Sequence, residues 1–416
     1  MIFKTYKHLS NFFSVLIFLY FCLRFFSSKE NWRSIKEKFF FFDKKIRPKG
    51  KLIWINGVSI GEAKSGLIVA DQILKKFPKS KILFSTSTLS AHNIISKSDK
   101  RIILTYSPLD ISFLIKKFVK KWKPDLTIFM ESEIWPNVIN EIKEEKLKFV
   151  ILNGRMSEKS FKLWKKLEFF SNNIFSKIDL CFAQDGLSKK RFQSLGTKNV
   201  KISGNLKFLS KQLDYDEGEY KKLRKELKSK KVITLFSSHK NEEMFLINCS
   251  KNLKKRIRNL FFIIIPRHPH NSKNVQENLK KNNLKFLIRS NEKRSIKESN
   301  FYIVDSFGEL GLFFKLSHIS LIGGSFVNNG GHNPIETNHF DCALIFGKHM
   351  QNFIEIERRI IATKSGFKVK NINDMEKKIL MLLENKKVWS DTIKNFKKLC
   401  ATESKKASLI IEKIYR

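Results

Sequence analysis

The chain has 416 residues, with 81 Lys and Arg against 39 Asp and Glu, which gives a net charge of +42. Its apolar content of 42%, with only 17 Gly and 8 Pro, excludes disordered, collagen-like and linker-like chains, and the length is typical of two or three domains. The five cysteines stand singly, without a CxxC pair, which is typical of a reducing compartment and argues against a thiolate zinc site.

The positive charge has three interpretations: nucleic-acid binding, attraction to an anionic membrane or substrate, and compositional drift of an AT-rich genome. The 39 Phe residues favour drift, because Phe is enriched beside Lys and has no electrostatic role. The Lys residues are spread along the whole chain, and no arginine-rich arm, zinc-finger spacing or RNA-binding aromatic motif is present. We therefore expect no nucleic-acid partner.

An apolar run, NFFSVLIFLYFCL, occupies residues 11–23 and continues through Phe25 and Phe26. A full membrane span needs about 20 apolar residues, and no small-residue cleavage site follows the run. We expect an uncleaved membrane anchor over residues 1–28, spanning or lying on the bilayer; the alternative is a buried helix of the folded domain. The basic residues after the run outnumber Lys4 and Lys7 before it, so the positive-inside rule places the remaining chain on the cytoplasmic face of the inner membrane. These residues are Lys29, Arg33, Lys36, Lys38, Lys44, Lys45, Arg47, Lys49 and Lys51.

From residue 51 onward, short β-branched or aromatic runs alternate with longer amphipathic stretches, which predicts an α/β fold with parallel βαβ units. The polar stretch 210–230 interrupts the alternation, so we expect two doubly wound domains, 29–209 and 210–416, facing a cleft, with the final helix packing back on the first domain. A helix is predicted over 62–77. Strands are predicted at 52–56, 81–86, 101–105, 126–131, 148–152, 178–183 and 200–203, then near 231–237, 260–265, 285–289, 301–305, 319–323 and 343–347.

The turn GVSIGE, Gly57 to Glu62, follows the first predicted strand and opens the helix. It matches G-x-S-x-G, which would make Ser59 the nucleophile of a serine hydrolase, but it lies on the first strand and no oxyanion-type HGGG segment precedes it. The alternatives are a general base at Glu62 and a carboxylate that only starts the helix.

In the second half, Asp214-Tyr215-Asp216 lies in the polar connector and is interpreted as a solvated acidic turn. Arg267 and His268 follow the strand FFIII between two prolines, which suits an anionic ligand, with a surface turn as the alternative. The histidines lack zinc-site spacing.

A glycine-rich loop follows the predicted strand 319–323 and leads to a helix beginning at Pro334. We expect its free backbone N–H groups to face a phosphate, with Asn333 as the N-cap and Glu336 accepting hydrogen bonds from ribose hydroxyls. The alternative is that the glycines only allow the backbone to turn. The turn at Gly308 and Glu309 has the same strand-to-helix setting.

Eight short strings of the sequence, in their order along the chain, resemble the lipid A Kdo transferases, which transfer 3-deoxy-D-manno-octulosonic acid (Kdo) from CMP-Kdo to a lipid A precursor. The resemblance runs from about residue 10 to beyond 350 and includes the apolar N-terminus. The strings are VSIGE (58–62), ESEIWPN (131–137), NGRMS (153–157), AQD (183–185), SGNLKF (203–208), PRHP (266–269), GELGL (308–312) and GGSFVNNGGHNPIE (323–336).

The resemblance implies a GT-B glycosyltransferase with an acceptor-binding N-terminal domain, a CMP-sugar-binding C-terminal domain and an inverting reaction without a metal or other cofactor. Glu62 matches the catalytic base, and Glu131 and Lys207 match transition-state stabilisers, with Glu133 a near neighbour of Glu131. The matched CMP contacts are Arg267, His268, Gly308, Glu309, Leu310, Asn333, Pro334, Ile335 and Glu336.

The sequence departs from the family at Asn56 and Gly57, where His-Ala is usual. The lipid A precursor and an anionic inner membrane are the expected partners, and Lys36, Lys38, Lys44 and Lys45 are expected to help docking.

Overall fold

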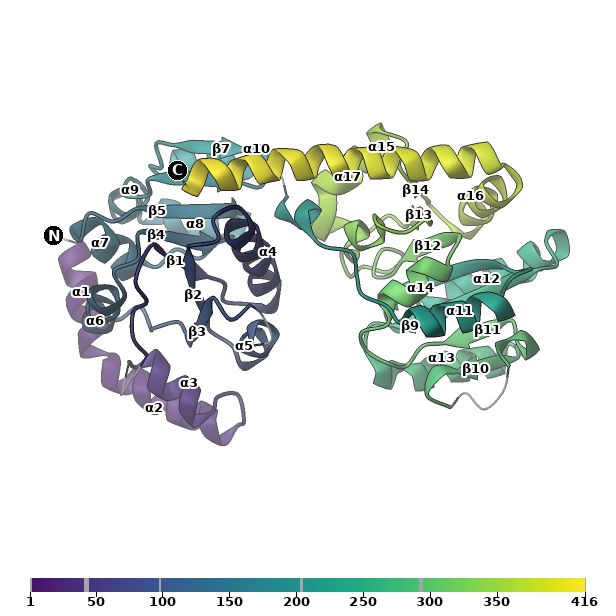
Figure 1. Ribbon diagram of the computed structural model, residues 1–416, viewed down its shortest axis with the longest axis horizontal. Helices are drawn as coiled ribbons and strands as arrows, with labels where there is room; N and C mark the ends of the chain where they lie inside the picture. The colour runs from purple at the N-terminus through teal and green to yellow at the C-terminus, as the bar shows by residue number, and fades with distance from the viewer. Residues whose placement is uncertain (1, 41–44, 97–98, 203–204, 292–294, 416) are drawn as a thin grey trace. The chain divides into compact units, whose positions relative to one another are not determined.

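The computed structural model describes residues 2–40, 45–96, 99–202, 205–291 and 295–415, which form two compact units (Figure 1). The N-terminal unit comprises Met1–Leu209 with Glu403–Arg416, and the C-terminal unit comprises Ser210–Thr402. Lys44 and the first two residues of the SGNLKF string, Ser203 and Gly204, lie outside the described residues.

The N-terminal unit is built on a parallel seven-stranded sheet with the order β3-β2-β1-β4-β5-β6-β7. Because the chain moves outward from β1 on one side and from β4 on the other, the carboxyl ends of these two neighbours form a topological switch point, where open α/β sheets bind ligands. The strands are β1 (Leu52–Asn56), β2 (Lys81–Thr86), β3 (Ile102–Tyr106), β4 (Leu126–Met130), β5 (Phe149–Gly154), β6 (Leu180–Ala183) and β7 (Val200–Ile202).

Helices cover both faces of this sheet, because every second side chain of a strand points to the same face. In β1, Leu52 and Trp54 pack into one apolar core, whereas Ile53 and Ile55 pack into the other. The helices and the short 3-10 helix η1 of this unit are α1 (Ile2–Phe12), α2 (Ser14–Phe26), α3 (Trp32–Lys38), α4 (Ile60–Lys76), α5 (Leu89–Ile95), α6 (Ser112–Trp122), α7 (Pro136–Glu144), α8 (Glu158–Lys166), α9 (Glu168–Phe175), α10 (Gly186–Ser194) and η1 (Leu206–Leu209).

The predicted anchor folds as two helices, α1 and α2, that pack against this unit. The Tyr6 hydroxyl donates to Asp110 Oδ2 at 2.9 Å, and Phe18 packs edge-on against Phe39 with ring centroids 5.0 Å apart. Within the described residues no single helix is long and apolar enough to cross a bilayer, although the bent pair Phe3–Phe12 and Ser14–Phe26, at 51° to each other, passes on combined length and composition. Membrane anchoring stays a prediction.

Two of the lysines expected to dock on a membrane have structural partners instead. Lys38 is buried and donates to both carboxylate oxygens of Glu30 at 2.6 and 2.7 Å. Lys45 donates to Glu37 Oε1 at 2.8 Å. The expectation that Lys38 contributes a surface charge is wrong, because its ammonium group is enclosed in an ion pair.

The C-terminal unit repeats this architecture with a second parallel seven-stranded sheet, ordered β10-β11-β9-β8-β12-β13-β14. Its switch point lies between β8 and β12, and β9 pairs with the other side of β8. The strands are β8 (Lys231–Ser238), β9 (Leu260–Pro266), β10 (Phe286–Ile288), β11 (Phe301–Ile303), β12 (Ile319–Ile322), β13 (Ala343–Phe346) and β14 (Phe367–Lys368). The α/β class with two parallel sheets is therefore confirmed.

The helices of the C-terminal unit include one in the predicted polar connector, where Asp216 is the N-cap and accepts from the Glu219 amide at 2.6 Å. In the last helix, Ala407 and Ile411 lie in the core of the N-terminal unit, and Tyr415 stacks on Phe77. The helices are α11 (Glu217–Glu226), α12 (Glu243–Arg256), α13 (Ser272–Lys281), α14 (Leu310–Leu316), α15 (Ile354–Ala362), α16 (Ile372–Glu384) and α17 (Lys386–Tyr415), of which α17 belongs to the N-terminal unit from Glu403 onward. The short 3-10 helices are η2 (Pro269–Asn271), η3 (Arg289–Asn291), η4 (Ile296–Glu298), η5 (Pro334–Thr337) and η6 (Gln351–Phe353).

Candidate functional site

Three carboxylates gather at the switch point of the N-terminal sheet. Glu62 lies in the first turn of α4, which follows β1, while Glu131 and Glu133 follow β4. Since β1 and β4 are adjacent and parallel, their carboxyl ends bring these groups to one edge. The negative charges of Glu133 and Glu131 add to the rise in the pKa of Glu62 that burial causes. The structure therefore brings together Glu62 and Glu131, two of the predicted catalytic residues, and Glu133, the near neighbour of Glu131.

The Glu62 side chain folds back over the start of its own helix. Its Oε2 atom accepts from the backbone N–H of Val58 at 2.8 Å and of Ser59 at 3.1 Å, while the Ser59 hydroxyl accepts from the Glu62 amide at 3.3 Å. This reciprocal capping box holds the carboxylate at the positive end of the helix dipole.

Burial raises the pKa of Glu62 to about 7, and the negative charges of Glu133 and Glu131 add to the effect. The two backbone amides oppose this rise by stabilising the carboxylate. A group with this pKa accepts and releases protons near neutral pH, as a general base requires.

Glu131 is bonded by a residue of the neighbouring strand β5, and Glu133 by a residue of its own loop. Glu131 has a positive φ of 57°, and its Oε1 accepts from Asn153 Nδ2 at 3.4 Å. Glu133 Oε2 accepts from the Trp135 indole at 2.7 Å, and burial raises the pKa of Glu133. Left-handed backbone at a non-glycine residue is uncommon and concentrates at functional sites.

Ser59 has the geometry of a helix cap. Its backbone, with φ −94° and ψ 169°, is ordinary extended chain, without the strained turn of a nucleophile elbow. Among the described residues its hydroxyl bonds only to the Glu62 amide, and no histidine contacts it. The geometry therefore counts against the serine hydrolase alternative.

The unusual Asn56-Gly57 pair is built into the interior. Asn56 Oδ1 accepts from the Ser85 hydroxyl at 2.7 Å and the Ser107 hydroxyl at 2.6 Å, and Asn56 is fully buried. A Cβ added at Gly57 would lie 3.0 Å from the Ala63 amide nitrogen and from Glu62 backbone atoms. Glycine here lets the turn pack closely on the first turn of α4.

Lys207, the third predicted catalytic residue, lies on η1, which packs against α4. Its backbone amide donates to Asn205 Oδ1 at 3.0 Å, and its side chain is half-buried. The structure thus places Lys207 beside the helix that carries Glu62.

In the C-terminal unit, an arginine and three histidines gather at the carboxyl ends of β9, β8 and β12. Arg267 and His268 follow β9 and are exposed, and the Arg267 amide donates to Ser238 O at 2.9 Å. His239 follows β8, and His332 lies in the loop after β12 with its Nε2 2.9 Å from His239 Nε2. Burial lowers the pKa of both His239 and His332, and the nearby Arg267 and His268 lower it further, so the four groups form one cluster.

The expectation that the glycine-rich loop offers free N–H groups to a phosphate is wrong for most of the loop, because the protein supplies its own anion. The buried carboxylate of Glu242 accepts from the amides of Gly324 at 2.7 Å and Phe326 at 3.0 Å, and from His239 N at 3.0 Å. The amides of Gly331 and His332 bond to carbonyls of the same loop. An anionic ligand must therefore be bound mainly by side chains.

The predicted helix at Pro334 is the four-residue 3-10 helix η5 (Pro334–Thr337). Asn333 is its N-cap as predicted, because its Oδ1 accepts from the Ile335 amide at 3.2 Å. Pro334 and Ile335 are buried, whereas Asn333 and Glu336 are partly exposed at the edge of the cluster. Asn333 Nδ2 lies 3.5 Å from Glu336 Oε1.

The GELGL turn lines a separate pocket whose walls include Tyr215, Asp216 and Leu312. Glu309 is already paired there: Arg289 donates to its Oε1 at 2.8 Å. Gly308, with φ of 86°, is exposed, and Leu310 begins α14. The turn is therefore fixed by an ion pair that leaves the Gly308 backbone open.

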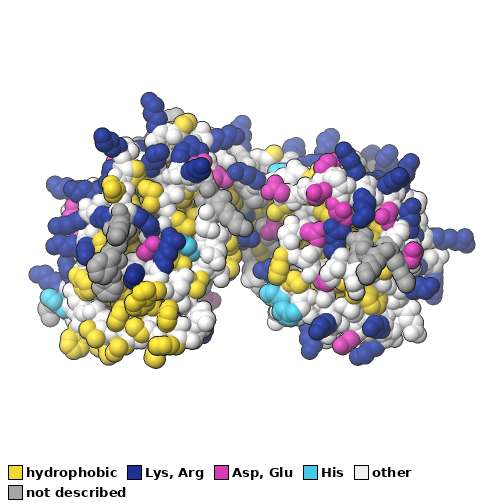
Figure 2. All heavy atoms as spheres, turned by 60° about the horizontal axis from the view of Figure 1, so that its bottom comes forward, with side chains coloured by type: hydrophobic (Ala, Val, Ile, Leu, Met, Phe, Trp, Pro, Cys, Tyr) yellow, Lys and Arg dark blue, Asp and Glu magenta, His cyan; other side chains and the backbone are white. Residues whose placement is uncertain are grey.

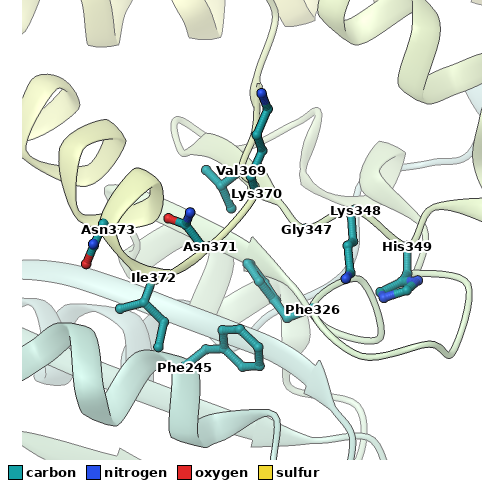
Figure 3. Close-up of a pocket in the computed structure, with 10 residues that line it drawn as sticks. All are labelled: Phe245, Phe326, Gly347, Lys348, His349, Val369, Lys370, Asn371, Ile372 and Asn373. Atoms are coloured by element: carbon teal, nitrogen blue, oxygen red, sulfur yellow. The ribbon is translucent and has the colours of Figure 1, made fainter.

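A further pocket lies between the end of β13 and the start of α16 (Figure 3). Phe245 and Phe326 lie side by side in it, with Lys348 and His349 on one side of them and Ile372 and Asn373 on the other. None of the predicted site residues lines this pocket.

Sequence reasoning missed His239 and Glu242, which follow β8 in the string SSHKNEE. Their position directly after a buried strand was the available signal. Their importance depends on the contacts with the loop after β12, more than eighty residues later in the chain.

The comparisons with known proteins identify the family. A model described as 3-deoxy-D-manno-octulosonic-acid transferase (kdotransferase) matches residues 33–210. Over 382 residues the chain is 35% identical to the 3-deoxy-D-manno-octulosonic acid transferase of Rickettsia bellii, covering 92% of this chain and 91% of that protein. The chain belongs to the Kdo transferase family. It is a glycosyltransferase.

Other similarities agree with this assignment. The Kdo transferase of Haemophilus influenzae is 31% identical over 357 residues, covering 85% of this chain and 84% of that protein. Among solved structures, a glycosyltransferase from Rickettsia africae superposes with a TM-score of 0.61 at 14% identity, covering 89% of this chain and all of that one. That likeness concerns the fold, which is GT-B-like.

Replacing Ser59 by Ala tests its role in this Kdo transferase. The substitution removes the helix cap and should lower the free energy of unfolding by about 1 kcal/mol, measured by denaturant titration. Kdo transfer should persist at a temperature where the variant is folded. Complete loss of transfer by a folded Ser59→Ala protein would contradict the capping role and revive the nucleophile.

Proposed function

We propose that this transferase moves Kdo from CMP-Kdo to a hydroxyl of a lipid A precursor, with inversion at the anomeric carbon and Glu62 as the general base. The observation that carries the proposal is the raised pKa of Glu62, about 7, in a carboxylate fixed by the amides of Val58 and Ser59. Family membership supports the substrate class.

The acceptor hydroxyl loses its proton to Glu62 as its oxygen attacks the anomeric carbon of Kdo. Attack from the face opposite the phosphate inverts that carbon, and the electron pair of the broken bond goes to CMP. Glu131 lies beside the base and lacks a cationic partner in the described residues that could quench its charge, which favours positive charge developing on the sugar. Lys207 is proposed to offset negative charge on the reacting groups.

The C-terminal unit is proposed to bind CMP-Kdo. Support comes from the cluster of Arg267 and three histidines at the carboxyl ends of β8, β9 and β12, where Arg267 and His268 are exposed. The phosphodiester of the donor carries one negative charge, and a guanidinium group matches its oxygens well. Gly308, Glu309, Leu310 and the Asn333-to-Glu336 segment are proposed to contact the nucleoside.

We also propose that the N-terminal unit lies on the cytoplasmic face of the inner membrane. Large apolar side chains of α1 and α2 are exposed, and Figure 2 shows apolar side chains gathered on one face with Lys and Arg around them. The opposite faces of these helices pack on the unit, which supports a segment lying in the interface. The exposed members are Leu9, Phe12, Phe13, Val15, Leu16, Leu19, Tyr20, Leu23, Phe25 and Phe26.

Replacing Glu62 by Gln should lower kcat/KM for Kdo transfer by about 10²–10⁴-fold, because the amide cannot take a proton. The amide oxygen can still accept from Val58 and Ser59, so the fold should survive. Purified protein is incubated with CMP-Kdo and a tetraacylated lipid A precursor, and product is quantified by mass spectrometry. The matched control is Glu158→Gln, since Glu158 is exposed on α8. Near-normal turnover by the Glu62 variant would refute its role as base.

The rate should rise with pH through about 7, because Glu62 must be ionised to accept a proton and its pKa is raised to about 7. Replacing Glu133 by Gln removes a neighbouring negative charge and should move the midpoint of the kcat/KM profile to lower pH. An unchanged midpoint would show that Glu62 does not control the profile.

Replacing Leu16, Leu19 and Leu23 together by Glu should reduce sedimentation of the protein with anionic vesicles, because this face of α2 is exposed. In the control, Glu replaces Ile354 and Ile361, two isoleucines of the C-terminal unit that are also exposed. Equal sedimentation of wild type and the α2 variant would remove the proposed membrane face.

A further inference from the structure

Two histidine rings from different loops of the C-terminal unit share a hydrogen bond. His239 Nε2 and His332 Nε2 are 2.9 Å apart, and the rings are parallel within 3° at a centroid distance of 5.1 Å. Among the described residues, neither Nδ1 atom has a hydrogen-bond partner, and both side chains are partly exposed.

The bond between the two Nε2 atoms constrains where the protons are. A neutral imidazole carries one N–H and one lone pair, so the ring that donates from Nε2 has a bare Nδ1, and the ring that accepts has its proton on Nδ1. The neutral pair thus presents one N–H donor and one acceptor at its two Nδ1 atoms. Adding one proton gives two outward donors without breaking the bond between the rings.

The surrounding structure holds this pair rigidly. Glu242 accepts from the amides of His239 and Gly324, and so ties the loop after β8 to the loop after β12. Gly324 has a φ of 71°, and a Cβ there would lie 3.4 Å from atoms of both rings. The rings therefore pack directly over a glycine that leaves them room.

The charged groups around the pair favour binding of an anion. Burial lowers the pKa of His332 to about 4 and also lowers the pKa of His239, and Arg267 and His268 from the end of β9 add to both effects. The carboxylate of Glu242 is occupied by backbone amides. An anion placed here would stabilise positive charge on the pair against burial and the nearby guanidinium of Arg267, and so favour the protonated pair.

We propose that His239 and His332 form a proton-accepting phosphate site, in which binding of a phosphomonoester dianion is coupled to uptake of one proton by the pair. This inference rests on the proposed binding of CMP-Kdo by the C-terminal unit, and it specifies which groups hold the phosphate.

The coupling matches the charge change of the reaction. The phosphodiester of CMP-Kdo carries one negative charge, and cleavage of the bond from the anomeric carbon leaves the electron pair on the phosphate, which becomes a dianion. A proton taken from solvent by the pair gives a second N–H donor to that phosphate. The proton of the acceptor hydroxyl goes separately to Glu62, so both protons are accounted for.

The test is isothermal titration calorimetry of the full-length protein with CMP at pH 7.5, in two buffers of different ionisation enthalpy. The difference in heat gives the protons taken up on binding. Wild type should take up a substantial fraction of a proton with CMP and none with cytidine, which lacks the phosphate.

His239→Gln and His332→Gln should each abolish the uptake and weaken CMP binding by about tenfold, while cytidine binding is retained and shows that the site is folded. His339→Gln, on the same unit and outside the cluster, should behave as wild type. His268→Gln should keep the uptake if the pair is its source.

The proposal is overturned if wild type binds CMP without proton uptake, or if only His268→Gln abolishes it. Those results leave the proposed transfer intact, because they still show CMP binding. Failure of the wild-type protein to bind CMP at all would instead count against the proposed binding of CMP-Kdo, and with it against a phosphate site at the two histidines.

Discussion

The carboxylate of Glu62 depends on a balance between burial and two hydrogen bonds. Burial and neighbouring carboxylates disfavour its charged form, whereas the amides of Val58 and Ser59 favour it. Burial and the neighbouring charges outweigh the amides, and the pKa of Glu62 rises to about 7. Gly57 lets the preceding turn pack closely on the start of α4, because a Cβ there would lie 3.0 Å from backbone atoms of Glu62 and Ala63. The local backbone and the chemistry of the site are therefore inseparable.

The C-terminal unit contains a second carboxylate at the start of a helix, and this carboxylate has more hydrogen-bond partners than Glu62. Glu242 also lies at the start of a helix after the first strand of its sheet, yet its carboxylate accepts from amides of a second loop, at Gly324 and Phe326, as well as from His239. It becomes an internal anion that fixes the glycine-rich loop. Among the described residues, Glu62 accepts hydrogen bonds only from amides of its own loop. The two carboxylates therefore differ in the number and origin of the amides that they bind.

The large positive charge is not one functional feature. Some cations are structural, such as Lys38 paired with the buried Glu30 and Arg289 paired with Glu309. Others are exposed at strand ends, such as Arg267. The apolar residues of the N-terminal helices are likewise divided between those packed on the unit, such as Phe18, and those exposed, such as Leu16. The net charge and hydropathy of the chain do not distinguish paired cations from exposed ones, or packed apolar residues from exposed ones.

The sequence by itself determined the α/β class, thirteen of the fourteen strands found in the described residues, the helix after β1 and the family, because strand burial, helical periodicity and ordered motifs are local properties of the chain. It also indicated Asn333 as a helix cap. The two-residue strand β14 was too short to produce a pattern. Tertiary structure alone decided that Glu242 fills the glycine-rich loop and that His239 meets His332. Those outcomes depend on which strand ends become neighbours, and pairing between distant segments leaves no signal in either segment by itself.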